Sequence, residues 1–529
     1  MNTDSQNRTL PASNDPLILA IDNGTQSVRA GLVDPAGRIY GLVKTPIEPY
    51  FSANPGWAEQ EPEYYWQMLC RTCKAVLDGN NGLKGRITAV TITTQRSTYV
   101  NLDRSGKPLR PAIVWMDNRK ANAHGIIPWF LVPALKALGL YQVAAYAVQY
   151  SRSNWIRQNQ PEIWDKTHKL LFLSGYLSYR MTGEFTDSYG NMIGTVPFDV
   201  KKSSWAGARD LKWRLFPIEQ DKLPALVRPT DLLGRITQQA SQETGIPAGL
   251  PLIAASNDKA CDVIGSGCLT PDRACISFGT TATINTQNER YVELRPLLPP
   301  YPSAIPGQFY SEVSVVRGLW LVSWFKEEFG LQERMQAQEK NVSPEELLEK
   351  LLKDVPAGSM GLVCQPYWTP GPELSPSAKG SVIGFGDIHT RAHLYRSIVE
   401  GLVYALREGG ELTQKKNRVA ITGIRATGGG STSDSILQIT ADIFKLPVER
   451  PRTNETSIVG AAIDAAVGLK LYSDFAGAVN TMTGVQKTFL PIRENAEIYD
   501  ELYRKVYRRM YRRLLPLFGN IRAITGYPE

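Results

Sequence analysis

Two short turns in this 529-residue sequence combine a glycine with hydroxyl side chains, a pattern suited to binding phosphate. Asp22-Asn23-Gly24-Thr25 follows an apolar run at residues 17–21, and Gly279-Thr280-Thr281 follows another at residues 274–278. Glycine lets a phosphate approach the backbone closely, and nearby N–H and O–H groups can donate hydrogen bonds to it. Either turn alone is better explained by an ordinary hairpin turn. The pair, however, predicts two loops that close on one polyphosphate from opposite sides.

Two aspartates stand at the ends of predicted strands and could assist phosphoryl transfer. The Asp22 carboxylate could hold a hydrated Mg²⁺ against a nucleotide. Asp258 follows an apolar stretch at residues 252–255. A carboxylate in that position could act as the general base that accepts the proton of an attacking hydroxyl. The alternative is that Asn257-Asp258 caps a helix over residues 259–264, and this motif taken alone favours capping.

A third candidate is the glycine-rich segment Thr427-Gly428-Gly429-Gly430-Ser431, with Ser433 shortly after it. It lies between a strand-like run at residues 419–424 and a helix-like run at residues 435–444. A glycine-rich turn that enters a helix can lie under a nucleotide base or ribose, with helix N–H groups free for polar contacts. The segment lacks the glycine-lysine-hydroxyl ending of a Walker A loop and the spaced glycines of a dinucleotide fingerprint. A flexible loop is the alternative.

The histidines and cysteines argue against several other enzyme classes. None of the four histidines accompanies a GxSxG elbow or an HExxH pattern, which counts against an esterase and a zinc protease. Six cysteines are few for this length, and the pair Cys70 and Cys73 has no second CxxC, so redox or metal roles are not expected. This cysteine usage fits a reducing compartment.

The order of predicted elements indicates an α/β protein. Residues 17–22, 28–33 and 38–44 predict a meander of three strands, followed by a helix over residues 61–77 and a strand over residues 87–93. A similar strand-turn-strand pattern recurs at residues 274–285. Each half opens with an apolar strand and a small-residue turn that carries a threonine, which indicates an ancient internal duplication.

Composition and charge limit the class of partner. Hydrophobic residues make up 43% of the chain and charged residues 21%, as in globular proteins, and the net charge is +8. The basic residues at 504–513 alternate with apolar ones at helical spacing, so we interpret them as the solvated face of a terminal helix and expect no nucleic-acid partner. No apolar run reaches the roughly 18 residues that span a bilayer. We therefore expect a cytoplasmic protein without a membrane partner; a homodimer is compatible with the sequence.

These motifs, in this order, resemble the FGGY carbohydrate kinases of the actin and hexokinase-like superfamily. Besides the turns above, the segments that carry the resemblance are Gly56-Trp57-Ala58-Glu59-Gln60, Gln95-Arg96, Trp115-Met116-Asp117-Asn118-Arg119, residues 380–400 and residues 428–442. The resemblance extends from about residue 17 to about residue 491. It implies two ribonuclease H-like domains with an interdomain active-site cleft. The implied parts are a disordered leader at residues 1–16, an N-terminal domain at 17–268, a C-terminal domain at 269–491, and a helical extension at 492–529.

The resemblance also implies a site, with ATP and Mg²⁺ as cofactors and a small sugar or polyol as substrate. Asp258 would be the catalytic base, and Asp22 would hold the Mg²⁺. The implied cofactor-binding residues are Asn23, Gly24, Thr25, Gly279, Thr280, Thr281, Gly428, Gly429 and Ser433. The implied substrate-binding residues are Trp57, Arg96, Trp115, Asp117, Asn257 and Lys259.

Some positions depart from the family pattern and bear on the substrate. Ser97 follows Arg96 where glycerol kinases carry a glutamate that contacts their substrate, which argues against glycerol. Lys259 follows Asp258 where relatives have an amide side chain, and it could reach the substrate or pair with a carboxylate. A ketopentose such as xylulose or ribulose is the expected substrate, with glycerol or a four-carbon sugar or polyol as alternatives. A non-catalytic ATP-binding sensor is the alternative of another class, but such a protein has no need of a base at Asp258.

Overall fold

The computed structural model describes residues 15–369, 374–375 and 377–527 and divides the chain into two compact units. Unit 1 comprises residues up to 267 together with 295–309 and 456–483, and unit 2 comprises 268–294, 310–455 and 484–529. The expected leader lies outside the described residues over positions 1–14. The contiguous division expected from the sequence did not include the two later segments of unit 1. Hydrophobic patterns reveal that a segment is buried, but they do not reveal which unit it packs against.

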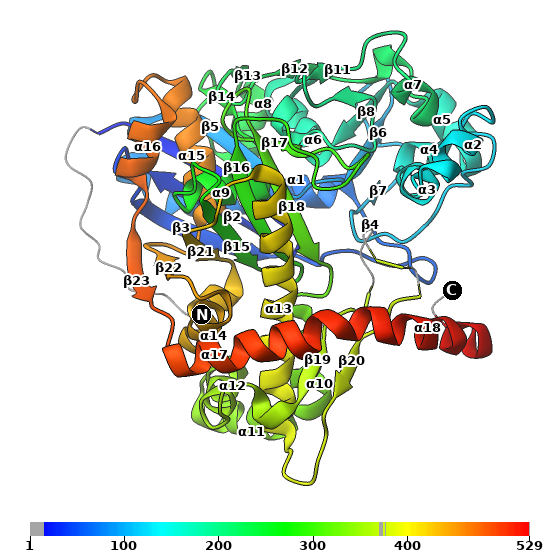
Figure 1. Cartoon of the computed structure of the whole chain (residues 1–529). Helices are drawn as coiled ribbons and strands as arrows, with labels where there is room; N and C mark the ends of the chain where they lie inside the picture. The colour runs from blue at the N-terminus through cyan, green and yellow to red at the C-terminus, as the bar shows by residue number, and fades with distance from the viewer. Residues whose placement is uncertain (1–14, 370–373, 376, 528–529) are drawn as a thin grey trace. The chain divides into compact units, whose positions relative to one another are not determined.

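The sheet of unit 1 begins with the expected meander and continues with parallel strands. Its order is β13-β14-β5-β1-β2-β3. Figure 1 shows β2, β3 and β5 of this sheet in blue and β13 and β14 in green. β1, β2 and β3 pair antiparallel, whereas β5 pairs parallel with both β1 and β14. The strands are β1 (Leu17–Asn23), β2 (Ser27–Val33), β3 (Ile39–Pro46), β5 (Ile87–Thr94), β13 (Leu232–Arg235) and β14 (Pro251–Ala254).

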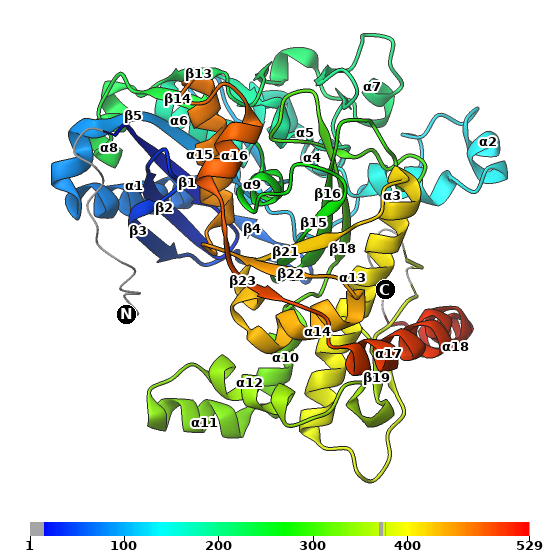
Figure 2. The same ribbon diagram turned by 60° about the vertical axis from the view of Figure 1, so that its left-hand side comes forward.

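Helices cover both faces of this sheet because its central strands are apolar on both faces. The odd-numbered residues of β1, such as Ile21, belong to the core that contains α1 (Pro62–Asp78). The next side chain, Asp22, points to the other face and contacts Ser457 of α15 (Thr456–Gly468). Figure 2 shows α1 and α15 with the meander between them. The candidate carboxylate on β1 therefore depends on a helix supplied from the far end of the chain.

The remaining elements of unit 1 are a second, smaller sheet and several short helices and strands. A small sheet with the order β4-β7-β6-β8 carries the Trp57 and Trp115 segments. Its strands are β4 (Glu59–Gln60), β6 (Tyr99–Leu102), β7 (Ala112–Ile113) and β8 (Lys169–Phe172). The other elements are η1 (Asn81–Arg86), α2 (Val132–Ala137), α3 (Tyr141–Gln149), α4 (Arg152–Asn159), α5 (Pro161–Lys166), α6 (Leu173–Thr182), β9 (Thr186–Ser188), η2 (Tyr189–Asn191), β10 (Phe198–Asp199), β11 (Ser204–Trp205), α7 (Lys212–Leu215), η3 (Gln220–Lys222), β12 (Ala225–Val227), α8 (Gln238–Thr244), α9 (Asp258–Gly265), β17 (Tyr301–Pro302) and α16 (Phe475–Met482).

Unit 2 repeats the strand arrangement of unit 1. Its main sheet contains β18, β16, β15, β21, β22 and β23 in that order. β15 pairs antiparallel with β16 and parallel with β21, as β1 does with β2 and β5. This shared order is what an internal duplication produces. The strands are β15 (Arg273–Phe278), β16 (Ala282–Asn288), β18 (Phe309–Val315), β21 (Gly423–Thr427), β22 (Val448–Pro451) and β23 (Val485–Phe489).

Helices around the second sheet complete its core. The long helix α13 (Arg391–Asn417) packs on β16 and on α14 (Asp434–Phe444), as Figure 1 shows in yellow and orange. The other elements are α10 (Trp320–Phe329), α11 (Leu331–Lys340), α12 (Pro344–Lys353), η4 (Ser359–Gly361), β19 (Val363–Gln365), β20 (Ser381–Ile383) and η5 (Gly429–Thr432). Together the two units confirm the predicted α/β class.

The C-terminal segment of unit 2 is helical through α17 (Arg493–Leu502), η6 (Tyr503–Tyr507) and α18 (Arg508–Thr525). Tyr503 and Tyr507 are buried in the core of unit 2, while the arginines between and after them are exposed. The aromatic residues therefore form the packed face of an amphipathic helix. None of the helices in the described part of the chain combines the length and apolar character needed to cross a membrane.

Candidate active site

Several candidate residues of unit 1 lie where three parallel strands end. Asp22 pairs with Thr93 between β1 and β5, and Ala254 of β14 pairs with Ile92 of β5. The three strands therefore end along one edge of the sheet, at Asn23, Thr94 and Ala254. Because the carboxyl ends of parallel strands are the usual place of ligand binding in such sheets, this edge is the candidate active site of unit 1.

Asp22 is buried and electrostatically coupled to other carboxylates. Its side chain accepts a hydrogen bond from Ser457 Oγ at 2.8 Å and lies 3.4 Å from Arg29 Nη1 at the same oxygen, Oδ2. Burial raises the pKa of Asp22 to about 6; Arg29 opposes the shift, and the charges of Asp258 and Asp262 add to it. The three carboxylates are therefore close enough to repel one another.

One oxygen of Asp22 is suited to a cation. Oδ1 is buried and has no hydrogen-bond partner within the described part of the chain. A buried carboxylate oxygen without a donor is costly, and a cation or its bound water would remove that cost. Among the described residues, no group of three or more His, Cys, Asp or Glu side chains could hold a metal. The donor set fits Mg²⁺, which is typically bound by one or two carboxylates, water and substrate phosphates.

Asp258 is the first residue of α9 and is only partly buried. Asn257 is the N-cap of this helix, since its Oδ1 accepts a hydrogen bond from the Ala260 N–H at 3.1 Å. Asp258 Oδ1 accepts from the Lys259 N–H at 2.9 Å, which directs the carboxylate over the start of the helix. The capping alternative thus holds for Asn257, while the Asp258 carboxylate stays accessible for a proton-accepting role.

The neighbours of Asp258 are occupied within the protein. Asn257 is 1% exposed, and its Nδ2 donates to the carbonyl of Gly190 at 2.7 Å. Lys259 Nζ lies 3.7 Å from Asp262 Oδ2 in the same helix. Of the two roles considered for Lys259, the structure therefore shows pairing with a carboxylate.

The side chains of Trp57, Trp155 and Arg119 pack together and form one surface, the Trp57 wall. The Trp57 ring meets that of Trp155 edge-on, with 5.3 Å between centroids, and the Arg119 guanidinium lies 3.8 Å above the Trp57 centroid. Asp117 is 1% exposed, accepts from the Ala58 N–H at 2.6 Å, and forms an ion pair with Arg119 at 2.8 Å. The structure thus uses the Asp117 carboxylate to join the two tryptophan-containing segments.

Thr25 links the first turn to the predicted sugar-binding strands. Its hydroxyl donates to Gln95 Oε1 at 2.8 Å and accepts from Trp115 Nε1–H at 2.9 Å. Arg96 lies 4.3 Å from the centroid of the Tyr301 ring. Ser97, directly after it, has a positive φ of 60°, a strained conformation for serine of the kind that clusters at functional sites.

In unit 2, the two predicted nucleotide loops lie side by side. Gly279 and Thr280 accept backbone hydrogen bonds at their carbonyls from the 318–319 turn, at 2.9 and 2.8 Å, and Thr281 Oγ1 donates to the Val316 carbonyl at 3.0 Å. Ser277 of β15 pairs with Thr427 of β21, so the loops that follow these parallel strands leave the same edge of the sheet. A ligand could contact both loops at once.

The glycine-rich loop is closely packed at Gly428 and exposed at Gly429. Gly428 has φ +77° and ψ 178°, and a Cβ there would lie 2.7 Å from the Phe278 carbonyl oxygen. Gly429 is exposed, and a Cβ there would meet no atom within 4 Å. Ser433 caps α14 through the Ile436 N–H at 3.1 Å, and its hydroxyl also bonds to Glu349. The backbone at Gly429 is therefore exposed to a ligand, while the Ser433 hydroxyl forms hydrogen bonds within the protein.

A matched pair of substitutions separates these two glycines. Gly429→Val should leave thermal stability unchanged and weaken nucleotide binding at least tenfold, because its side chain occupies open space above the loop. Gly428→Ala should instead destabilise the protein by about 1–3 kcal/mol, since its backbone conformation is essentially restricted to glycine. Thermal melting and calorimetric titration with ATP measure both effects. Equal nucleotide affinity in wild type and Gly429→Val would exclude this loop from the nucleotide site.

Asp187 is a buried carboxyl group that is hydrogen-bonded to the turn in contact with Asn257. It is fully buried in the middle of β9, and it accepts hydrogen bonds from Ser174 Oγ and Asn191 Nδ2, both at 2.8 Å. Burial nevertheless raises the pKa of Asp187 to about 6. Asn191 ends the η2 turn, whose Gly190 carbonyl holds Asn257. The turn that carries Asp258 thus rests on a second buried carboxyl group.

The raised pKa of Asp187 predicts a pH-dependent stability. The folded protein holds this proton up to about pH 6, whereas the unfolded chain releases it near pH 4, so the group destabilises the fold as pH rises between these values. Over that interval, the wild type should lose about 2–3 kcal/mol relative to Asp187→Asn, which has no proton to release. Denaturant unfolding of both proteins at pH 4.5 and 7 measures this difference. Parallel pH profiles would show that Asp187 does not titrate in this range.

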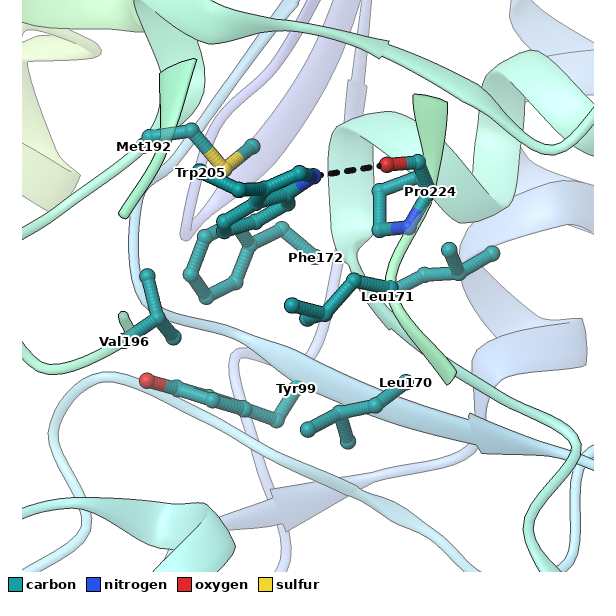
Figure 3. Close-up of a pocket in the computed structure, with 9 residues that line it drawn as sticks. Tyr99, Leu170, Leu171, Phe172, Met192, Val196, Trp205 and Pro224 are labelled. Atoms are coloured by element: carbon teal, nitrogen blue, oxygen red, sulfur yellow. Dashed lines mark hydrogen bonds between the residues drawn. The ribbon is translucent and has the colours of Figure 1, made fainter. Parts of the chain in front are cut away.

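Two cavities in unit 1 lie apart from these residues. The pocket in Figure 3 has a volume of about 10 Å³, room for roughly one water molecule, and is a packing gap beside Tyr99 and Trp205. A more open groove of about 570 Å³ has a basic rim. Its polar lining residues are Tyr189, Lys201, Lys202, Ser203, Arg228 and Asp231. Neither cavity is lined by a candidate residue, so neither is the substrate site inferred from the sequence.

Several residues of the site gave no signal in the sequence. Ser457 contacts Asp22 from 435 positions away, and Glu349 binds Ser433 from 84 positions away. Neither belongs to a glycine-rich turn or a strand end. Arg450 holds the glycine-rich loop by donating to the Ser431 carbonyl at 2.7 Å. Its place at the end of β22, a strand adjacent to β21, is the one feature that could have indicated this role.

Models of one protein family match both halves of the chain. The N-terminal domain of the FGGY family of carbohydrate kinases matches residues 17–265, and the C-terminal domain of the same family matches residues 274–469. The uncharacterized sugar kinase YgcE of Escherichia coli K12 is 32% identical over 486 residues, which cover 91% of each chain. A xylulose kinase of Staphylococcus epidermidis RP62A is 27% identical over 488 residues, or 92% of this chain and 94% of the relative.

A solved structure shows the same fold. Gluconate kinase from Lactobacillus acidophilus superimposes with a TM-score of 0.81, covering 96% of this chain and all of the other, at 21% sequence identity. That likeness bears out the expected two-domain, actin and hexokinase-like fold. The two family domains together cover most of the chain, and membership of a kinase family implies the use of ATP. The chain belongs to the FGGY family of carbohydrate kinases and is a phosphotransferase of the sugar-kinase class.

Proposed function

We propose that this kinase transfers the γ-phosphoryl group of ATP to a hydroxyl of a ketopentose, with Asp258 as the general base. The observation that carries the proposal is the position of Asp258. Its carboxylate is accessible at the start of α9, at the same sheet edge as Asp22. A base there can accept the proton of the substrate hydroxyl. The hydroxyl oxygen forms a bond to the γ-phosphorus as the bond between that phosphorus and the ADP oxygen breaks.

The two units have separate tasks in this proposal. In unit 1, the Trp57 wall, Arg96 and Trp115 bind and orient the sugar, while Asn257 and Asp117 hold the backbone around it. In unit 2, the backbone around Gly279 and Gly429 binds the nucleotide. In unit 1, the first turn, with Asn23, Gly24 and Thr25, offers further donors for a phosphate group. Transfer requires that the two bound substrates come within reach, and exclusion of water then favours the sugar as acceptor.

Mg²⁺ is the proposed metal, with Asp22 as its protein ligand. When bound, the ion neutralises charge on the transferring phosphoryl group. The buried, unpaired Oδ1 of Asp22 supports this assignment. Ser457 and Arg29 orient the carboxylate at its other oxygen.

The choice of a ketopentose rests on two observations. A relative that matches over nearly its whole length is named as a xylulose kinase. In addition, Ser97 stands where glycerol kinases carry a substrate-contacting glutamate, and a serine leaves more room beside Arg96. Glycerol and four-carbon polyols remain the second candidates, because the site edge contains the same base and the same arginine that a smaller polyol would use.

The substrate class is tested by ADP release from ATP and Mg²⁺ with a panel of ketoses, aldoses and polyols. The proposal predicts the highest kcat/KM with D-xylulose or D-ribulose. A preference for glycerol or erythritol by tenfold or more would favour the second candidates. Folded protein that binds ATP yet shows no acceptor-dependent ADP release would instead favour a non-catalytic sensor.

A further inference from the structure

We propose that Asp464 is a positioning residue for the catalytic turn: its carboxyl group holds the Ser256 amide and thereby fixes the place of Asp258. Asp464 lies on α15, 208 positions from Ser256 in the sequence. The inference rests on the proposed role of Asp258 as the base. It adds a residue that belongs to none of the motifs from which the site was predicted.

Every polar group of Ser256 is used to anchor this turn. The Ser256 N–H donates to Asp464 Oδ2 at 3.2 Å, and its hydroxyl donates to the Gly190 carbonyl at 2.9 Å. Its carbonyl accepts from Thr93 Oγ1 at 2.8 Å and from Cys261 Sγ at 3.3 Å. The four partners come from α15, η2, β5 and α9. A residue with no side-chain role in chemistry is thus held from four sides.

This anchoring has a geometric consequence for Asp258. β14 ends at Ala254 and α9 begins at Asp258, so three residues make the whole connection. Gly190 approaches so closely that a Cβ there would overlap Ser256 Oγ, which leaves the turn no room to move in that direction. Asp464 holds the backbone through the amide. A catalytic group displaced by about 1 Å can lose about 100-fold in rate, so a fixed amide directly affects the base.

The cost of placing Asp464 in the core indicates that the contact matters. Asp464 is completely buried on a helix whose neighbouring residues, Ile463 and Ala465, are also buried and apolar. Its Oδ1 has no hydrogen-bond partner in the described part of the chain. Burying an incompletely paired carboxyl group is unfavourable, and an apolar residue would serve packing better. What the carboxyl group supplies is an acceptor for an otherwise unpaired buried N–H.

The place of Asp464 relative to the turn is set by close packing of α15 on α9. A Cβ at Gly460 would overlap the Cys261 carbonyl, and a Cβ at Gly265 would overlap the Thr456 carbonyl, so the two backbones touch. Burial raises the pKa of Asp464 well above its usual value, which favours the uncharged form of the carboxyl group. Asparagine has nearly the same shape as the uncharged acid and keeps the acceptor oxygen. It is therefore the conservative replacement.

Three variants test the inference in the full-length protein. Asp464→Ala and Asp464→Val both remove the acceptor oxygen. Alanine leaves the space of the carboxyl group empty, whereas valine fills most of it. Asp464→Asn keeps the acceptor oxygen. The measurements are kcat and KM for ATP, with D-xylulose, D-ribulose and glycerol as acceptors. Hydrogen exchange of the peptide containing Ser256 is measured in the same proteins. Asp442→Ala, which removes a buried carboxylate that accepts the Ile492 N–H in unit 2, is the control for exchange.

The expected result is a loss of about tenfold or more in kcat for Ala and Val, with KM for ATP within about twofold of wild type. Exchange at Ser256 should rise at least tenfold in both and stay at the wild-type rate in Asp442→Ala. Asp464→Asn should remain within about threefold of wild type in kcat and exchange. Unchanged exchange in Ala and Val, unchanged kcat despite faster exchange, or an Asn variant as poor as Ala would each overturn the inference. Failure of the proposed base is seen separately, as full activity of Asp258→Asn.

Discussion

Asp258→Asn should lower kcat for sugar phosphorylation by about 10²–10⁴-fold and leave ATP affinity nearly unchanged. The amide is nearly the same size and suits the first position of α9, so the fold is preserved. It cannot accept the hydroxyl proton, so the barrier to transfer rises while the nucleotide contacts in unit 2 are untouched. Steady-state ADP release and calorimetric titration with ATP measure the two quantities.

Asp199→Asn is the matched control for this variant. It makes the same chemical change in the β10–β11 turn of unit 1, where Asp199 accepts the Lys201 N–H at 3.1 Å. The control should retain wild-type kcat. If Asp258→Asn also kept a kcat within about threefold of wild type, Asp258 would not be the base, whatever the substrate.

Gly279→Val should weaken ATP binding by tenfold or more, with the protein still folded. Gly279 does not have a left-handed φ, and a Cβ added at this position would have the Thr281 carbonyl oxygen as its nearest neighbour, at 3.2 Å. The fold can absorb this contact by a small shift. The two methyl groups of the valine side chain, however, would occupy space that the resemblance to the FGGY family assigns to phosphate. Calorimetric titration with ATP gives the dissociation constant.

Gly519→Val on α18 is the control, since a Cβ there meets no atom within 4 Å and the helix carries no candidate residue. Both variants add the same side chain to unit 2. A titration in which Gly279→Val and Gly519→Val bind ATP equally well would remove the 279–281 turn from the nucleotide site. Loss of binding in both would point to a general effect on unit 2.

The sequence predicted the strand ends well because parallel strands that are far apart in the chain lie side by side in the sheet. Asp22, Gln95 and Asn257 each follow an apolar run, and such runs become central strands whose carboxyl ends share one edge. The structure shows the same arrangement in unit 2, where the 279–281 turn and the glycine-rich loop follow neighbouring parallel strands. The repeated strand order of the two units likewise agrees with the duplication inferred from two similar turns.

The side-chain partners were beyond the reach of the sequence. The structure shows Asp117 in an ion pair with Arg119 and Ser433 in a helix cap, and no motif in the sequence indicated these partners. Such roles depend on which residue happens to lie opposite in space. The sequence likewise did not indicate that residues 456–483 pack with unit 1. This segment brings α15, and with it Ser457 and Asp464, onto a sheet formed more than 200 residues earlier.

The central claim, phosphoryl transfer to a sugar hydroxyl, is tested most directly by identifying the phosphorylated product. Purified protein is incubated with ATP, Mg²⁺ and D-xylulose or D-ribulose, and mass spectrometry measures sugar phosphate, ADP and free phosphate, with Asp258→Asn in parallel. The account predicts one sugar phosphate for each ADP in the wild type and almost none in the variant. ADP accompanied by free phosphate, or equal product from wild type and variant, would contradict it.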